Sequence, residues 1–344
     1  MRVPRGDARA AREETMITRR AFTLASTAAV ASVSLPARPA RAAEKWRHAL
    51  VSSKGDAAFF FMAKKKGFFD KHGLDVELIE LKGSRDVLRA VLADEAESAD
   101  SNPSDVLPAL EKGADVKFVG SAIEGYAYAM YVRPEIRSWA DLAGKTFGVS
   151  GPGSAPHMFA LAMLDTEKVA VDAIQIANTG GTTARIKALV GGRIDATAAS
   201  TEFVPLADKL KIRVLGLAKD LAPKFPRFYE VMQTRTIRDR REAAVKFLAA
   251  YMEGLRYCVD HRDEAIMLSA EINKEKPDDP RYAYSYVEIV NDRLVSLNME
   301  INRDKIAWMQ DMMLRLHQLA NPVDIDARID TSLRDQALQI VGKR

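Results

Sequence analysis

The sequence predicts an α/β protein built from two lobes. The chain shows short segments with the apolar–polar alternation of strands. These segments alternate with stretches of about ten residues that have the apolar spacing of a helix. This alternation occurs twice, over 46–132 and over 146–218, and strands separated by such helices are typical of parallel sheets. From residue 239 the pattern is helical. We therefore expect two sheets, each flanked by helices, and a group of C-terminal helices.

The helices of the first set begin at residues that can cap a helix, or at a proline suited to its first turn. These residues are Asp56, Ser84 and the pair Asn102-Pro103, and glycines stand where the first and third helices end. The helices are expected over 57–66, 84–92 and 103–112, and the strands over 46–51, 74–81, 116–121 and 126–132.

The second set contains a glycine turn between a strand and a helix. The strand over 146–149 runs into Gly151, Pro152 and Gly153, and a helix begins behind Ser154. Such a turn presents backbone N–H groups to a bound anion. Further helices are expected over 182–190, 243–257, 282–297 and 305–319, and strands over 174–177, 194–199 and 214–218.

The glycine turn does not fit a nucleotide-binding loop. A dinucleotide fingerprint needs a third glycine where this chain has Pro156, and an acidic residue at the end of the next strand, where it has Asn178. The Gly-Lys-Ser/Thr sequence of a Walker loop is also absent. The turn therefore predicts a site for a small anionic or strongly polar ligand rather than a nucleotide.

Residues 1–42 are typical of an export signal of the twin-arginine kind. Arg19-Arg20 precede a mildly apolar run over 21–35, and small residues then offer a signal peptidase its cleavage site. The run is too short and too rich in Ser and Thr to span a bilayer. We expect cleavage near Ala42/Ala43 and a periplasmic protein, and Met16 is a second candidate for the first residue.

The chain without its signal is close to neutral. Residues 1–42 hold eight of the 51 Lys and Arg residues and three of the 47 Asp and Glu residues. The net charge of +4 therefore stems from the signal and gives no reason to expect nucleic acid as a partner. The single cysteine, Cys258, excludes an intrachain disulfide, and the five histidines lack the spacing of a metal site. We expect no metal and no cofactor.

Three motifs in a fixed order carry a family resemblance. They are "AFFFMAKKKGFFDKHGLDVELIEL" over 58–81, "DLAGKTFGVSGPGS" over 141–154 and "ARIKALVGGRIDATAAS" over 184–200. Together they resemble the nitrate/sulfonate/taurine-type solute-binding proteins of ABC importers, a grouping that also includes proteins related to thiamine-pyrimidine synthesis. The resemblance covers roughly residues 45–260. It departs from the family at Glu95 and Ser98, where such proteins usually have Gly and Asp.

The resemblance implies a two-lobed periplasmic-binding-protein fold of type II, with a hinge that the chain crosses twice and a ligand between the lobes. The first crossing is expected near 131–134, where an extended aromatic stretch meets a proline, and the return between about 214 and 226. Lobe 1 would then comprise 44–131 and 227–344, and lobe 2 would comprise 132–226. The partners implied are an ABC permease and ATPase at the membrane, and we expect a monomer.

Polar residues at four helix N-termini are the candidate ligand contacts. In an open α/β sheet the turns before these helices gather at the carboxyl ends of the strands, where ligands bind. Helix N-termini supply unpaired N–H groups and partial positive charge. A single Ser, Asn or Thr at such a place is more often only a cap, but the convergence of all four favours binding. Arg85 can pair with a carboxylate or sulfonate, whereas Glu202 in the cleft would repel an anion or recognise an amine. The predicted ligand-binding residues are Lys54, Ser84, Arg85 and Asn102 on lobe 1, and Ser154, His157, Thr182 and Thr183 on lobe 2.

The export signal and the resemblance favour a binding protein over an enzyme. The sequence has no Gly-x-Ser-x-Gly elbow, and the pyrimidine-forming relatives carry a Cys-rich motif that a chain with one cysteine lacks. We expect capture of a small organic anion, a sulfonate or a carboxylate, for import. Two alternatives stay open: a pyrimidine-forming enzyme of the same fold, and a periplasmic subunit that senses its ligand.

Overall fold

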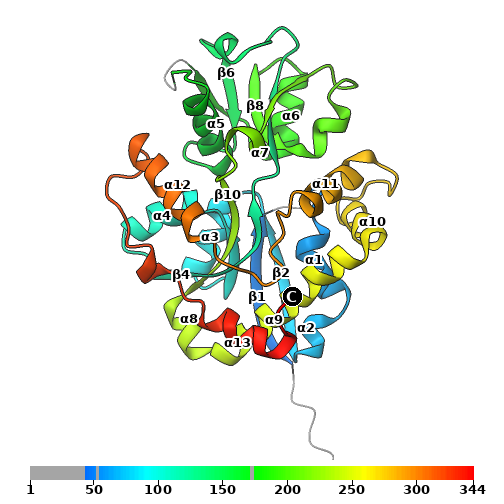
Figure 1. The fold of residues 1–344 in the computed structure, drawn as a ribbon, viewed down its shortest axis with the longest axis vertical. Helices are drawn as coiled ribbons and strands as arrows, with labels where there is room; N and C mark the ends of the chain where they lie inside the picture. The colour runs from blue at the N-terminus through cyan, green and yellow to red at the C-terminus, as the bar shows by residue number, and fades with distance from the viewer. Residues whose placement is uncertain (1–42, 52–53, 171–173) are drawn as a thin grey trace, which may run out of the picture. The chain divides into compact units, whose positions relative to one another are not determined.

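The protein contains two sheets, each flanked by helices (Figure 1). The computed structural model describes residues 43–51, 54–170 and 174–344, so the predicted export signal lies outside the described residues. Each sheet with its helices forms one lobe. The prediction of a two-lobed α/β architecture is confirmed.

The first lobe is built on a five-stranded sheet in the order β2-β1-β3-β10-β4. β1 pairs in parallel with β2 and β3, while β10 runs antiparallel to β3 and β4. The sheet therefore takes its fourth strand from a segment far along the chain. Its strands are β1 (Glu44–Val51), β2 (Leu74–Leu81), β3 (Ser98–Ser101), β4 (Val116–Gly125) and β10 (Pro226–Gln233).

The second lobe is built on a five-stranded sheet in the order β7-β6-β8-β5-β9. β6 is parallel to β7 and β8, while β5 runs antiparallel to β8 and β9. Its strands are β5 (Tyr128–Val132), β6 (Thr146–Val149), β7 (Gln175–Asn178), β8 (Ala196–Ser200) and β9 (Arg213–Leu217).

Both sheets are mixed. The expectation of parallel sheets is wrong for one strand in each, β10 in the first sheet and β5 in the second. The parallel strands of each sheet end on the side that faces the other lobe. β5 and β10 are the strands by which the chain arrives in a lobe after crossing, so each begins on that side and runs in the opposite direction. The antiparallel pairs follow from the two crossings.

The first crossing comes earlier than predicted. The segment Tyr128–Val132 is a strand of the second sheet, so the chain leaves the first lobe between Gly125 and Tyr128, not near 131–134. The expected end of lobe 1 at residue 131 is therefore wrong. The return falls between Leu217 and Pro226, within the expected stretch.

Long-range helix packing completes the first lobe. α9 (Arg241–Asp260) packs against α1 (Ala58–Lys65), and Gly254 makes this approach possible, because a Cβ there would lie 2.7 Å from the backbone N of Ala63. Phe69 stacks on Phe247 of α9 with ring centroids 5.5 Å apart. The remaining helices of this lobe are α2 (Phe68–Lys71), α3 (Ser84–Leu92), α4 (Pro103–Glu111), α8 (Thr234–Asp239), α10 (Arg262–Ile272), α11 (Pro280–Asn291), α12 (Arg303–Arg315) and α13 (Ser332–Val341).

The helices of the second lobe follow its strands directly. They are α5 (Ala155–Thr166), α6 (Thr182–Val190) and the short α7 (Ala218–Leu221), and a 3₁₀ segment, η3 (Thr201–Leu206), continues β8. Among the helices of the described residues, none has both the length and the hydropathy needed to cross a bilayer.

Candidate ligand-binding site

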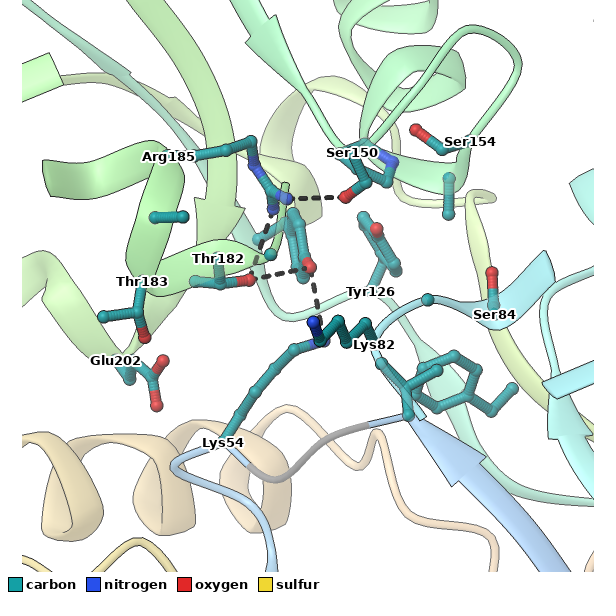
Figure 2. Close-up of a pocket in the computed structure, with 18 of the residues that line it drawn as sticks. Lys54, Lys82, Ser84, Tyr126, Ser150, Ser154, Thr182, Thr183, Arg185 and Glu202 are labelled. Atoms are coloured by element: carbon teal, nitrogen blue, oxygen red, sulfur yellow. Dashed lines mark hydrogen bonds between the residues drawn. The ribbon is translucent and has the colours of Figure 1, made fainter. Parts of the chain in front are cut away.

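A cavity of about 540 Å³ is lined by residues of both lobes. From the first lobe come the segments after β1 and β2 and the start of α3, and from the second come the glycine turn after β6, the start of α6 and the start of η3. These segments follow the carboxyl ends of parallel strands, the place where open α/β sheets bind ligands. The cavity is the candidate ligand-binding site, and Figure 2 shows the side chains of several residues that line it.

Six of the eight predicted ligand-binding residues line this cavity, and two do not. Asn102 is fully buried at the start of α4: its side-chain oxygen accepts from the Ser104 N–H at 2.9 Å, and its amide donates to the carbonyl oxygens of Pro226 and Arg227 in β10. All its polar atoms are thereby used in the first lobe. The residues that line the cavity are Lys54, Ser84, Arg85, Ser154, Thr182 and Thr183.

His157 lies behind the glycine turn rather than in the cavity. Its Nδ1 accepts a hydrogen bond from the backbone N–H of Gly153 at 2.8 Å, and burial lowers the pKa of the imidazole. Gly153 has φ of 72°, a left-handed conformation that favours glycine. A neutral His157 therefore holds the turn that forms one wall of the site.

Ser84 and Arg85, at the start of α3, both contact the buried carboxylate of Asp105 in α4. The Ser84 hydroxyl donates to Asp105, and the Arg85 Nε lies 3.6 Å from Asp105 Oδ1. Burial outweighs these contacts and raises the pKa of Asp105 to about 6. Arg85 also donates through Nη2 to the Pro152 carbonyl at 2.9 Å, so this half-exposed side chain connects the two lobes.

Arg185 is one of the residues of the site that the sequence does not predict. Its side chain extends from α6 into the wall of the cavity (Figure 2), and the residue is 1 % exposed. The guanidinium donates to Ser150 Oγ and the Gly180 carbonyl, both at 2.7 Å, and to Thr182 Oγ1 and the Ala198 carbonyl, both at 3.2 Å. All four acceptors are neutral. None of these hydrogen-bond partners is a carboxylate, and an unpaired buried charge is costly.

Tyr128 lies between the cations of the two lobes. Its hydroxyl is 3.3 Å from Lys54 Nζ and 3.5 Å from Thr182 Oγ1, and its ring stacks on Tyr126 with centroids 4.0 Å apart. Burial acts to raise the pKa of Tyr128, but the positive charges of Lys54 and Arg185 overcome this effect and hold the pKa at about 7.

Glu202 forms a separate, acidic part of the wall. It accepts hydrogen bonds from the Ser200 hydroxyl at 2.8 Å and from the backbone N–H of Gly55 in the other lobe. Burial raises the pKa of this carboxyl group. Glu202 thus lies in the cleft, the position in which the sequence predicts that it would repel an anion or recognise an amine. It also connects the two lobes through its hydrogen bond with Gly55.

A sequence signal for Arg185 exists in the pattern of α6. The buried positions of this helix include Ile186 and Leu189, and Arg185 is the charged residue that shares their face. A charge on the apolar face of an amphipathic helix is unusual, because Arg is rarely buried fully without a partner. Tyr128 gives no such signal, since every residue of β5 is buried.

The architecture defines the class of the protein: two α/β lobes with a ligand cavity between them form a periplasmic-binding-protein fold. The chain belongs to the family described as NMT1/THI5 like, whose profile matches residues 54–265. Within the described residues there is no group of three or more His, Cys, Asp or Glu side chains placed to hold a metal ion.

The chain is similar to proteins of more than one name. A protein of Brucella abortus (strain 2308) named "Putative binding protein" is 23 % identical over 301 residues, which cover 85 % of this chain and 89 % of the relative. A "Putative thiamine biosynthesis protein" of Haemophilus influenzae is 24 % identical over 216 residues, covering 61 % of this chain and 67 % of the relative. The periplasmic aliphatic sulphonate binding protein SsuA from Escherichia coli has a similar structure, with a TM-score of 0.68, 19 % identity and coverage of 83 % of this chain and 92 % of that chain.

Proposed function

We propose that the protein is the periplasmic solute-binding subunit of an ABC importer and that it captures a small organic anion, a sulfonate or a carboxylate, in the cavity between its lobes. The observation that carries the proposal is the buried guanidinium of Arg185, whose partners are all neutral. None of these direct partners carries a negative charge, and a ligand anion would bring one to the guanidinium in a site of low dielectric, where charged hydrogen bonds are strong.

The rest of the cavity fits an anion with an organic body. Lys54 lies across the cavity from Arg185, and the hydroxyls of Thr182 and Ser154 add polar groups near the helix N-termini (Figure 2). Tyr126, Phe228 and Val51 provide apolar surface in the same wall. The similarity to a sulphonate-binding protein and to proteins named as binding proteins supports this ligand class and a role in import. Binding without chemical conversion, an ABC permease and ATPase as partners, and a monomeric state belong to the same proposal.

Small organic anions are expected to stabilise the protein against heat. A ligand present at about 100 times its dissociation constant adds about 2.7 kcal/mol to the free energy of unfolding. The measurement is a thermal-shift screen of methanesulfonate, longer alkanesulfonates, aliphatic and aromatic carboxylates, nitrate and thiamine-type pyrimidines. Stabilisation by neutral or cationic compounds alone would contradict the anion proposal, and release of a converted product from a stabilising compound would favour the enzyme alternative.

The export signal is also part of the proposal, and it gives a separate prediction. Replacing both Arg19 and Arg20 by Lys is expected to retain the protein in the cytoplasm, because the twin-arginine route reads this pair. Cell fractionation measures the effect, and mass spectrometry of the periplasmic wild type should give an N-terminus near Ala43. Arg12→Lys is the matched control and should be exported normally. A periplasmic protein that retains Arg19-Arg20 would show that the segment is not a cleaved signal.

A further inference from the structure

The hydroxyl of Tyr128 occupies the point at which the cations of the cavity converge. Lys54 Nζ lies 3.3 Å from this oxygen, and Thr182 Oγ1, which accepts from Arg185 Nη2 at 3.2 Å, lies 3.5 Å from it. Lys54 reaches this point from the first lobe, while Thr182 and Arg185 reach it from α6 of the second (Figure 2). An anion that contacts Lys54 and the Thr182 side of Arg185 therefore lies next to the Tyr128 oxygen.

The charged and titratable groups around Tyr128 favour its phenolate form. Lys54 and Arg185 contribute two positive charges, and Lys82 lines the same cavity. Tyr126 stacks on the ring of Tyr128 and hydrogen-bonds to it. Burial is the main cause, and the neighbouring Tyr128 the second, that raises the pKa of Tyr126 well above its usual value. Three acidic residues line the cavity, Glu202, Asp86 and Glu275, and Glu202 is hydrogen-bonded to Gly55 and Ser200. A buried phenol surrounded in this way has a pKa of about 7.

We infer that Tyr128 couples ligand binding to protonation: in the ligand-free protein its phenolate is the internal counter-ion of Lys54 and Arg185, and an incoming anion replaces that charge while the phenolate takes up one proton from solvent. The inference rests on the proposed function of the site. One negative charge enters with a monoanion and one is lost by protonation of the oxygen, so the sum of charges in the cavity stays the same. The protonated hydroxyl can then donate a hydrogen bond to the bound anion.

The pH dependence of binding has a defined sign. Below the pKa of Tyr128 the oxygen is already protonated in the free protein, so Tyr128 adds no pH dependence there and its effect on affinity for the anion is most favourable. Above that pKa each binding event must take up a proton, and affinity falls towards tenfold for each pH unit. Tyr128 is thus a residue that determines both the affinity and the working pH of the site.

The first test uses the ligand-free protein. The ultraviolet absorbance of tyrosinate is followed between about pH 6 and about pH 8.5, on either side of the pKa of about 7. We expect one tyrosine to ionise in this range in the wild type and the same step to be absent in Tyr128→Phe. Tyr284→Phe is the matched control and should keep the step, because burial raises the pKa of Tyr284. A wild type without this step would overturn the inference and leave the proposed function standing.

The second test adds methanesulfonate as the probe anion. Increasing concentrations are expected to move the tyrosinate midpoint to higher pH, and the affinity of Tyr128→Phe, measured by calorimetry, should be independent of pH over the same range. If methanesulfonate stabilises the protein against heat while the midpoint stays in place, the inference is wrong and the proposed function holds. If no anion of the thermal-shift screen stabilises the protein, the proposed function fails, and the inference that rests on it fails as well.

Discussion

Arg185→Met is expected to remove most of the affinity for the anion. Met is a flexible apolar side chain of similar length, so the change deletes the charge and the donors without opening a large cavity. Truncating one partner of a buried, hydrogen-bonded charge pair costs about 2–5 kcal/mol, which corresponds to a loss of roughly 30-fold or more in affinity. The measurement is isothermal titration calorimetry at a fixed pH with the anion that gives the largest thermal shift.

Two further variants separate the loss of charge from damage to the fold. Lys187→Met removes an exposed positive charge from the same helix and should leave affinity unchanged. Arg185→Lys keeps the charge but provides fewer donors for Ser150, Gly180 and Ala198, so its affinity should fall between those of the wild type and Arg185→Met. If Arg185→Met folds with the wild-type circular dichroism spectrum and binds within about threefold of the wild type, the anion site lies elsewhere in the cavity.

Arg227→Met is expected to cause the largest loss of stability. Arg227 of β10 forms an ion pair with Asp56, and the two residues are 2 % and 5 % exposed. Removing the arginine leaves the carboxylate buried without its cation, which costs about 3–5 kcal/mol. Urea denaturation should show a lower midpoint with an unchanged slope. Because Asp56 lies in the loop that carries Lys54, anion affinity should fall as well.

Two controls test this prediction: one removes both charges of the buried pair, and the other breaks an exposed ion pair. The double variant Asp56→Asn with Arg227→Met should recover most of the lost stability, because the buried carboxylate is removed together with its partner. Arg303→Met breaks an exposed ion pair with Asp326 and should cost no more than about 1 kcal/mol. An Arg227→Met variant as stable as Arg303→Met would show that the buried pair contributes little to the stability of the first lobe.

Local sequence patterns were sufficient to predict most of the fold. The predicted bounds are correct for the strands over 74–81 and 146–149 and for the helix over 182–190. Apolar alternation or helical spacing is strong in these segments, and a glycine stands near an end of each of them. The first crossing was missed because β5 is buried throughout and nothing in its pattern shows a change of sheet. Its place depends on pairing with β8 and β9, which are distant in sequence.

The candidate site was only partly predictable for a similar reason. Asn102 and Thr182 both stand at a helix start behind a strand, yet Asn102 is held by carbonyl groups of β10 and Thr182 lines the cavity. The sequence does not reveal which of two such residues finds partners within its own lobe. Arg185 and Tyr128 belong to the site because folding brings them near Lys54. Lys54 is more than 70 positions away from either in the sequence, so local patterns do not reveal this proximity.

The central place of β10 in the first sheet decides the order in which the newly made chain can fold. β10 lies between β3 and β4, so the first sheet cannot be completed until residue 233 has been synthesised, and α9 adds its packing against α1 only after that. The strands of the second lobe, by contrast, lie in one continuous stretch between residues 128 and 217. Since domains generally fold as units during synthesis, the second lobe is complete first. The first lobe is then assembled from two segments of the chain, one synthesised before the second lobe and one synthesised after it.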